Sequence, residues 1–496
     1  MAEYCIGIDL GTSGVKCLLL GDDGVIVDSA SEKYTPDFGA NGHVEQDPSV
    51  WWDKTFSCVK ALAGKNPQIS ANIKALAVSG QMHSSVFLDK DGGVIRPAIL
   101  WNDTRTTPQT KEIYEIAGSV ENVLSEVYNL ALEGFTLPKI LWLKENEPDN
   151  FKKVSSVIMP KDYINYRLTG NVYTDYSDAA GTLAFDVKNR RFNESFVEKI
   201  GIPKEILPKA IESTGTVGVI SAQTASELGL PQGVKVIAGG ADNSCAAIGN
   251  GVVSSNSAVV SVGTSGTVVA FLDDIKSKVT GAVHLFNYSY PNSFYAMGCM
   301  LSAGECLNWL TREILTGESF DELNELVAKT PIGSNHLLFA PYLFGERCPH
   351  TDPSARGIFF GLSSLTKKGE MARAVMEGVA FGLKDMFNLV LDFASMDEVY
   401  ITGGGAKSPV WSQIICDVLN VPLKLLNISE GPAFGAALIA GVGAGVFPSF
   451  ADAKEKSMRV IKTYTPQNPE KYAEYYKVFQ KLYTTNKSLY QELLSL

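Results

Sequence analysis

The 496-residue sequence lacks the short motifs by which many enzymes are recognised. It contains no G-x-x-x-x-G-K-[ST] loop and no G-x-G-x-x-G after an expected strand, so a P-loop enzyme and a dinucleotide-binding fold have no support. H-E-x-x-H and G-x-S-x-G are also absent, which removes the commonest metalloprotease and hydrolase interpretations. The eight cysteines form no C-x-x-C pair and no metal-ligand spacing, so we expect reduced, mostly buried thiols.

Features of secreted, membrane-bound and nucleic-acid-binding proteins are missing as well. The N-terminus has no basic segment followed by an apolar one, so we expect no signal peptide. The most apolar late stretch, residues 435–447, is shorter than the roughly 20 residues that a membrane-spanning helix needs. A net charge of −11 and a pI of about 5.2 argue against nucleic acid and anionic membranes as partners. We therefore expect a soluble cytoplasmic protein.

The length and the order of the expected elements point to a duplicated α/β protein. A chain of 496 residues is too long for one ordinary core. The first ninety residues alternate strand and helix patterns, and one helix is expected to start at Pro48 with Asp47 as its N-cap. From Ser257 the opening three-strand pattern begins again. We predict domains at residues 1–250 and 251–496, joined by a short hinge.

One short pattern occurs in both halves, as "IGIDLGTSGV" at residues 6–15 and "VVSVGTSGTV" at residues 259–268. Each copy predicts two strands joined by a Gly-Thr-Ser-Gly turn. Such a turn presents backbone N–H groups and two hydroxyls, those of Thr12 and Ser13 in the first copy, and this array suits phosphate. A plain hairpin turn is the simpler explanation of a single copy. Two copies in the same context favour two lobes that grip a nucleotide.

The two copies differ at Asp9, whose counterpart in the second is Ser261. A carboxylate beside a phosphate repels it unless a cation lies between them. Mg²⁺ usually binds through one or two carboxylates, with waters and phosphates as further ligands. We therefore predict Asp9 as a Mg²⁺ ligand. Lys16, at the far end of the first hairpin, either faces phosphate oxygens or is a solvent-facing strand lysine.

A further carboxylate, Asp242, follows an apolar strand and a Gly-Gly pair and opens a helix of small residues. One interpretation is that it caps this helix. The other is that it acts as a general base, which takes a proton from an attacking hydroxyl, as carboxylates do in kinases.

Three longer stretches identify a family. The chain resembles the FGGY carbohydrate kinases, of the actin-like, ribonuclease-H-like ATPase superfamily, from about residue 4 to residue 447. The stretches are "GFTLPKILWLKEN" (134–146), "GIFFGLSSLTKKGEMARAVMEG" (357–378) and "ITGGGAKSPVW" (401–411). The resemblance implies an α/β fold of two ribonuclease-H-like domains with an active-site cleft between the lobes.

The resemblance also implies an activity, the ATP-dependent phosphorylation of the terminal hydroxyl of a ketopentose. Within the family, five stretches are most similar to the members that act on D-xylulose; they cover residues 79–84, 96–106, 160–170, 177–182 and 341–353. Two positions depart from the family pattern. Ser84 replaces the glycine of Met-His-Gly, and Cys348 replaces the threonine of "GERTPH". If Ser84 points inward, it shrinks the sugar pocket and adds a hydroxyl.

The resemblance assigns residues to three groups. Asp242 is the catalytic base, and Asp9 supports Mg-ATP. The predicted sugar-binding residues are Gln81, Met82, His83, Trp101, Asp242 and Asn243. The predicted nucleotide-binding residues are Thr12, Ser13, Lys16, Gly263, Thr264, Gly304, Asn308, Gly404, Gly405 and Ala406.

Alternatives remain at two of these positions. His83, one of five histidines, is either a sugar ligand or a residue that hydrogen-bonds locally. Trp101 is either a wall of the sugar pocket or part of a helix start that Asn102 or Asp103 caps.

Other functions remain open too: an FGGY kinase for ribulose, gluconate or another ketose, a chaperone-like or filament-forming ATPase of the superfamily, and a sugar-sensing regulator. The last should have lost Asp9 or Asp242, and both are present. The oligomeric state is open, with a homodimer as one outcome.

Overall fold

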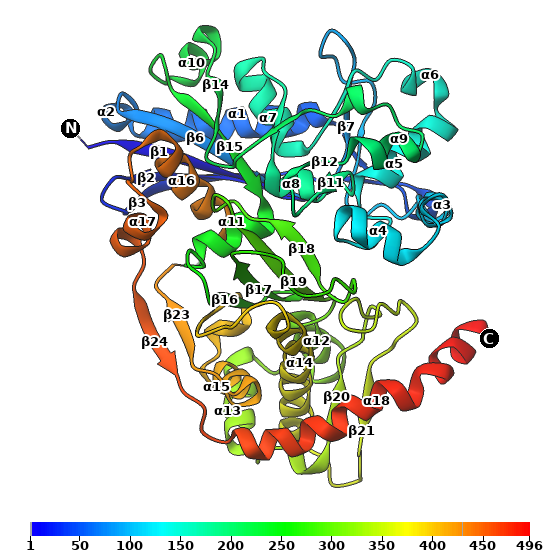
Figure 1. Cartoon of the computed structure of the whole chain (residues 1–496). Helices are drawn as coiled ribbons and strands as arrows, with labels where there is room; N and C mark the ends of the chain where they lie inside the picture. The colour runs from blue at the N-terminus through cyan, green and yellow to red at the C-terminus, as the bar shows by residue number, and fades with distance from the viewer. Residues whose placement is uncertain (1, 429) are drawn as a thin grey trace.

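The computed structural model describes residues 2–428 and 430–496, and each half of the chain contributes one large sheet (Figure 1). The first sheet has six strands in the order β14-β15-β6-β1-β2-β3. Their bounds are Thr216–Val219, Lys235–Ala241, Ile73–Gly80, Tyr4–Leu10, Gly14–Gly21 and Ile26–Lys33. The second has seven strands in the order β18-β19-β17-β16-β22-β23-β24. Their bounds are His284–Asn287, Phe294–Met300, Gly266–Leu272, Ser257–Val262, Glu398–Thr402, Leu423–Leu426 and Val460–Tyr464.

The two sheets share one strand arrangement. In the first, β1 pairs antiparallel with β2 and parallel with β6, and β6 pairs parallel with β15. In the second, β16 pairs antiparallel with β17 and parallel with β22, and β22 pairs parallel with β23. Both Gly-Thr-Ser-Gly turns join the central strand of a sheet to its antiparallel neighbour. The predicted repeat is confirmed for these strands, but the third strand differs, because β2 pairs with the next strand, β3, whereas β17 pairs with β19 and not with β18.

Helix α1 (Pro48–Lys65) covers β2 and β3 of the first sheet. Asp47 is its N-cap and accepts a hydrogen bond from the backbone N–H of Ser49, as predicted. Cys58 and Leu62, four residues apart, are buried on the face that meets the sheet.

Two equivalent helices, α11 (Asp242–Gly249) after β15 and α16 (Gly431–Ala444) after β23, cross between the lobes. Glycines allow the close crossing. A Cβ atom at Gly435 would lie 1.8 Å from the carbonyl oxygen of Cys245, and one at Gly7 of β1 would lie 2.0 Å from that of Ala433. Helix α16 therefore packs on the first sheet although it belongs to the second half of the chain. A division at residue 250 places the two large sheets in different parts of the chain. It does not separate them structurally, because α16 of the second part packs on the first sheet.

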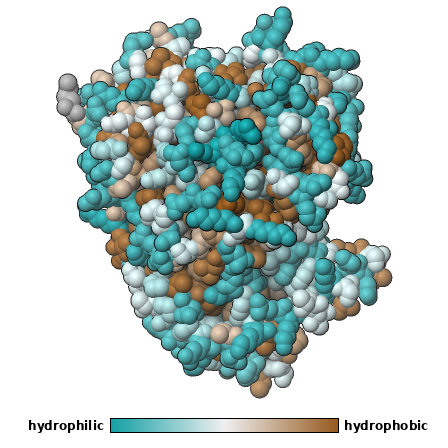
Figure 2. Space-filling view, in the orientation of Figure 1, coloured by the Kyte–Doolittle hydropathy of each residue, from teal (hydrophilic) through white to brown (hydrophobic). Residues whose placement is uncertain are grey.

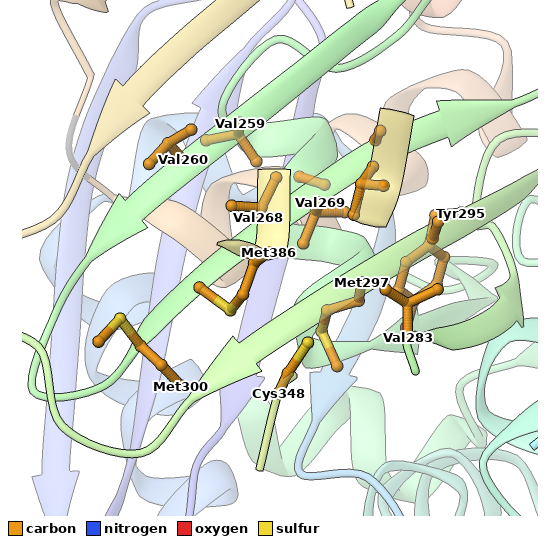
Figure 3. Close-up of a cluster of buried hydrophobic side chains, with 14 of the residues drawn as sticks. Val259, Val260, Val268, Val269, Val283, Tyr295, Met297, Met300, Cys348 and Met386 are labelled. Atoms are coloured by element: carbon orange, nitrogen blue, oxygen red, sulfur yellow. The ribbon is translucent and has the colours of Figure 1, made fainter. Parts of the chain in front are cut away.

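Helix α14 (Lys368–Leu391) covers the second sheet with a tightly packed apolar face. Figure 3 shows Met386 of this helix among Val268 of β17 and Met297 and Met300 of β19. A Cβ atom at Gly298 would lie 2.7 Å from the Cβ of Met386, so the helix sits directly on β19. Helix α14 thus covers β17, the strand that begins at Gly266 of the second Gly-Thr-Ser-Gly turn.

The other helices are α2 (Pro67–Ser70), α3 (Thr107–Ala117), α4 (Val120–Val127), α5 (Thr136–Asn146), α6 (Pro148–Phe151), α7 (Pro160–Thr169), α8 (Tyr176–Ala180), α9 (Glu194–Lys199), α10 (Ala222–Leu228), α12 (Gly304–Trp309), α13 (Phe320–Lys329), α15 (Pro409–Leu419), α17 (Phe450–Ser457) and α18 (Pro469–Ser495). Small sheets pair β4 (Asp37–Phe38) and β8 (Ala98–Ile99) with β5 (Val44–Gln46), β7 (Val86–Leu88) with β9 (Ser156–Ile158), β10 (Tyr173–Asp175) with β13 (Lys209–Ile211), β11 (Phe185–Asp186) with β12 (Arg191–Phe192), and β20 (Leu338–Ala340) with β21 (Ile358–Phe360).

The polarity of the surface and the state of the cysteines are as the composition predicts. On the face in Figure 2, hydrophobic residues are scattered among hydrophilic ones, and the end of α18 projects from the body. Within the described residues, no helix is long and apolar enough to cross a membrane. All eight cysteines are free, and all except Cys299 are buried.

Candidate active site

The two predicted catalytic carboxylates lie at one edge of the first sheet. Asp9 near the end of β1 stands beside Ser79 of β6, and Ser79 also stands beside Gly240 of β15, two residues before Asp242. Because these three strands are parallel, their carboxyl ends meet at this edge. Asp9 and the backbone that leads into Asp242 therefore lie at the same edge of the sheet.

Asp242 is the first residue of α11 and not its N-cap. The N-cap position is Ala241, and the interpretation of Asp242 as a cap is wrong. Its Oδ1 instead accepts hydrogen bonds from the backbone N–H (2.6 Å) and the side-chain Nδ2 (2.9 Å) of Asn243. Burial raises the pKa of Asp242 to about 6, although both bonds from Asn243 lower it. A carboxyl with a pKa near neutrality can accept a proton at physiological pH and release it again.

Burial, with the charge of Asp242 next, raises the pKa of Asp9 to about 7, while a hydrogen bond with Ser79 and the charge of Lys16 lower it. Lys16 stands opposite Asp9 in the hairpin, but its ammonium forms an ion pair with Glu430, just before α16. The sequence-based alternatives for Lys16 are a position facing phosphate oxygens and a position facing solvent. The ion pair with Glu430 is neither of these. Among the described residues, Asp9 forms no ion pair, although the charge of Lys16 still lowers its pKa.

Buried groups hold the loop of Gln81, Met82, His83 and Ser84 that follows β6. The backbone N–H of Gln81 donates to the carbonyl oxygen of Leu10 (3.0 Å). Ser84 is fully buried; its hydroxyl donates to Gln81 Oε1 (3.2 Å) and accepts from the backbone N–H of Trp101 (3.0 Å). The condition under which Ser84 would add a hydroxyl to the sugar pocket is therefore not met, because this hydroxyl bonds to Gln81 and Trp101 within the protein.

His83 is partly exposed and has a φ of 67°, in the left-handed region. Its Nδ1 lies 2.6 Å from the carbonyl oxygen of Gly181 and must donate there, because a carbonyl only accepts. Burial lowers the pKa of His83 to about 3, so the imidazole is neutral and its Nε2 is a hydrogen-bond acceptor. The ring of His83 thus uses Nδ1 for a bond within the protein and keeps Nε2 as an acceptor for a ligand.

Trp101 joins this loop to the first hairpin. Its indole Nε1 donates to Thr12 Oγ1 (2.9 Å), and its side chain stays partly exposed. Helix α3 begins only at Thr107, so the alternative of a helix start capped by Asn102 or Asp103 is wrong. Asp103 is instead buried in an ion pair with Arg105.

The second lobe brings together most of the predicted nucleotide residues. The backbone N–H of Gly304, at the start of α12, donates to the carbonyl oxygen of Gly263 (2.8 Å), and that of Ala303 donates to the carbonyl oxygen of Thr264 (2.9 Å). A Cβ atom at Gly304 would lie 2.5 Å from Gly263 O, so only glycine fits there. Asn308 lies one turn further along α12.

The glycine-rich loop after β22, residues 403–405, packs against Val262 at the end of β16, directly before Gly263. A Cβ atom at Gly403 would lie 2.6 Å from the carbonyl oxygen of Val262, and one at Gly405 would lie 2.5 Å from its Cγ1. Gly404 is exposed with no other group within 4 Å of its Cβ position, whereas Ala406 is buried. Gly404 is therefore the member of this loop with space for a ligand.

The sugar-side residues also meet the second lobe. Met82 Sδ lies 3.6 Å from Asn243 Nδ2 and 3.9 Å from the hydroxyl of Tyr295 on β19. The ring of His83 lies 6.0 Å from that of Phe286 on β18. No hydrogen bond between described residues joins the Thr12–Ser13 turn to the Gly263–Thr264 turn.

Sequence reasoning missed a lysine that supports His83. Lys139 of α5 is completely buried, and its ammonium donates to the carbonyl oxygens of His83 (3.0 Å) and Gly134. The hydroxyl of Thr136 donates to the same His83 oxygen (3.0 Å). Both residues lie within the 134–146 stretch quoted above, but nothing in that stretch by itself indicates a buried lysine.

Comparison with known proteins decides the family. The model of the FGGY family of carbohydrate kinases, N-terminal domain, matches residues 4–249, and that of the C-terminal domain matches residues 258–444. The chain belongs to the FGGY family of carbohydrate kinases. The expected fold class is confirmed with it.

Individual relatives cover the whole chain. A xylulose kinase from Bacillus subtilis (strain 168) is 40% identical over 99% of both chains. The crystal structure of a xyloylose kinase from Brucella ovis superimposes with a TM-score of 0.92 at 33% identity, covering 98% of this chain and 100% of that one. A gluconate kinase structure from Lactobacillus acidophilus has a TM-score of 0.91 at 28% identity and covers 99% of both chains.

Proposed function

We propose that this carbohydrate kinase transfers the terminal phosphoryl group of ATP to the terminal hydroxyl of D-xylulose. The observation that carries the proposal is the position of Asp242 beside the loop of residues 81–84, which we call the sugar loop. Asn243, which bonds to Asp242 Oδ1, also contacts Met82 Sδ in this loop. The xylulose kinase from Bacillus subtilis, similar over 99% of its length, supports D-xylulose as the substrate.

The chain's own residues account for the sugar side of the reaction. His83 Nε2 accepts a hydrogen bond from a sugar hydroxyl, and the Met82 side chain packs against a carbon face. Asp242 accepts the proton of the attacking hydroxyl, while the new O–P bond forms and the bond to the ADP oxygen breaks. The neutral imidazole disfavours a carboxylate at the same point, because two acceptors would face each other; this argues against gluconate.

The site also fits Mg²⁺. Groups of three or more potential ligand side chains are absent from the described residues, but Mg²⁺ bound with ATP needs only one or two carboxylates, completed by waters and phosphates. Asp9 would supply such a carboxylate, and the lysine nearest to it in the hairpin, Lys16, forms its ion pair with Glu430. When bound, Mg²⁺ neutralises charge on the phosphates. Asp9 would hold the ion, and the Gly263–Thr264 turn and Gly404 would offer backbone N–H groups to the nucleotide.

A coupled ADP-release assay tests the proposal with D-xylulose, ribulose, fructose, gluconate and glycerol as acceptors. We expect the highest kcat/KM for D-xylulose and a phosphate at its terminal carbon, read by phosphorus NMR of the product. A preference for gluconate or glycerol over every ketopentose would contradict the sugar assignment. ADP release that no sugar accelerates would contradict the kinase assignment itself and favour an actin-like ATPase.

A further inference from the structure

Three serines from separate parts of the chain surround the backbone that leads into Asp242. Ser177 lies on α8 in the first lobe, Ser289 lies between β18 and β19 in the second lobe, and Ser244 lies on α11, two residues after Asp242. All three have no exposed surface. None has a role in the mechanism above, and none can reach a substrate from a fully buried position.

Their hydrogen bonds close a ring around residues 241–244. The hydroxyl of Ser244 donates to Ser289 Oγ (2.8 Å), and the hydroxyl of Ser289 donates to Ser177 Oγ (3.2 Å). The backbone N–H of Ala241, the residue before Asp242, also donates to Ser177 Oγ (2.9 Å). A second bond joins Ser289 to α11, because the backbone N–H of Ser289 donates to Ser244 Oγ (2.8 Å).

A buried ion pair sets the direction of every bond in this ring. Ser177 donates its only proton to Asp175 Oδ2 (2.5 Å), and Asp175 Oδ1 lies 2.9 Å from the ammonium of Lys161. Asp175 Oδ2 accepts this proton while Oδ1 of the same carboxyl group pairs with the lysine. Ser177 Oγ therefore has both lone pairs free for Ala241 and Ser289. A hydroxyl offers one donor and two acceptor positions, and all three of Ser177 are used.

The ring is packed so closely that it also constrains Gly240. A Cβ atom at that position would lie 2.1 Å from Ser289 Oγ and 3.1 Å from Ser177 Oγ. The backbone of residues 240–241 is thus held by serines on two sides, one from each lobe. A shift of Ser289 with the second lobe would be transmitted to the residue directly before Asp242.

We infer that Ser177 and Ser289 are positioning residues that hold Asp242 in place for the phosphoryl transfer, and that Ser289 makes this placement depend on the second lobe. The inference rests on the proposed role of Asp242 as the base. A misplacement of about 1 Å at a reacting group can lower a rate by about a hundredfold, so the loss of one hydroxyl here has a measurable effect.

Single variants test the inference against a matched control. Ser213 is also buried and donates to the same Asp175 Oδ2 (2.6 Å), but its hydroxyl does not bond to residues 240–244. We expect Ser177→Ala and Ser289→Ala to lower kcat by about tenfold to a hundredfold. KM for ATP should stay near the parent value. Ser213→Ala should lose a similar amount of thermal stability to Ser177→Ala and keep near-parental kcat.

A double-mutant cycle separates positioning from general damage. If Ser177 acts only through Asp242, Ser177→Ala should lower kcat in the parent and have no further effect in an Asp242→Asn background. Residual turnover of Asp242→Asn is measured at high enzyme concentration with D-xylulose and Mg-ATP, and circular dichroism confirms that each variant is folded.

Each contrary result has a distinct meaning. A Ser177→Ala enzyme with the kcat of Ser213→Ala overturns the inference and leaves the proposed function in place. An equal loss from Ser177→Ala in both backgrounds overturns it too, because the serine would then act independently of Asp242. Near-parental turnover of Asp242→Asn overturns the base assignment itself, and this inference with it.

Discussion

His83, the residue we propose as a sugar ligand, is held by several buried groups of the protein. Its left-handed backbone, with a φ of 67°, is a conformation that non-glycine residues adopt at a cost of about 1–3 kcal/mol. Three bonds stabilise it: Thr136 and Lys139 donate to its carbonyl oxygen, and its Nδ1 donates to Gly181. These contacts also fix which ring nitrogen carries the proton. The residue's role therefore depends on neighbours that never touch the substrate.

Removing the ammonium of Lys139 should loosen this arrangement. We expect Lys139→Met to raise KM for the sugar by about tenfold, the equivalent of about 1.4 kcal/mol, because His83 loses one of the donors that hold its backbone. KM for ATP should not change. Steady-state kinetics with each substrate varied in turn measures both constants.

Lys144→Met is the matched control for this change. Lys144 lies on the same helix as Lys139. Its ammonium donates to the carbonyl oxygen of Gly201 (2.8 Å) at an exposed position, and not to His83. Equal KM values for the sugar in the two variants would contradict the role of Lys139.

The raised pKa of Asp242, about 6, predicts opposite effects of pH on activity and stability. A base works when deprotonated, so kcat/KM should fall as pH drops through about 6. A folded-state pKa above the ordinary value of 3.8 means that the folded protein binds this proton more tightly than the unfolded chain. Stability from this group is therefore highest below pH 3.8 and is lost as pH rises through 6.

Asp242→Asn should accordingly abolish most turnover, by about two to four orders of magnitude, and raise the melting temperature. The gain should be larger at pH 8, where Asp242 is ionised in the parent, than at pH 5. Calorimetry of both proteins at the two pH values measures it. A gain independent of pH would mean that the ionised carboxylate is not the source of the instability.

At the scale of elements, the crossing of α11 and α16 connects the two halves of the chain. The carbonyl oxygen of Cys245 lies where a side chain at Gly435 would begin, so the helices touch backbone to backbone. We expect Gly435→Ala to destabilise the protein by about 1–3 kcal/mol or more, because the added methyl must push α16 away from α11. Urea unfolding curves measure the change.

Gly64→Ala is the control for this substitution. Gly64 is an exposed residue of α1 with nothing within 4 Å of its Cβ position. Alanine there should stabilise the protein by about 0.5–1 kcal/mol, because glycine is the poorer helix former. A Gly435→Ala protein as stable as Gly64→Ala would show that the crossing tolerates a wider spacing.

For the whole molecule, the proposed function predicts that the two lobes divide the substrates between them. The sugar loop lies at the edge of the first sheet, and Gly263, Gly304 and Gly404 lie around the end of β16 in the second. His83→Ala should therefore raise KM for the sugar and leave KM for ATP unchanged. Gly304→Ala should do the reverse, because its methyl would displace the carbonyl of Gly263 and with it the second turn.

Calorimetric titration with sugar alone provides the check on this division. Gly304→Ala should bind D-xylulose like the parent, and His83→Ala should bind it more weakly. If either variant changes both KM values alike, the lobes do not act separately in substrate binding. The homodimer left open by the sequence stays a prediction.

Local patterns in the sequence determined a large part of this protein. The strands on either side of both Gly-Thr-Ser-Gly turns, the Asp47 cap of α1 and the repeat of the strand order follow from residues close together in the chain, where hydrogen bonding and side-chain alternation act over a few positions. The family followed from three longer stretches. Asp9 could be singled out because its counterpart in the second copy of the turn is Ser261, and Asp242 because it follows an apolar strand and a Gly-Gly pair.

Only the tertiary structure decided which groups meet. Lys16 pairs with Glu430, more than 400 positions away, and α16 packs on a sheet made by the other half of the chain. Ser84 turns its hydroxyl into the protein, and Ser289 reaches Ser177 across the lobes. Such contacts depend on how helices and sheets pack, and packing joins residues whose separation in sequence carries no periodic signal. The family and the candidate residues could thus be read from the sequence, while the contacts that support those residues could not.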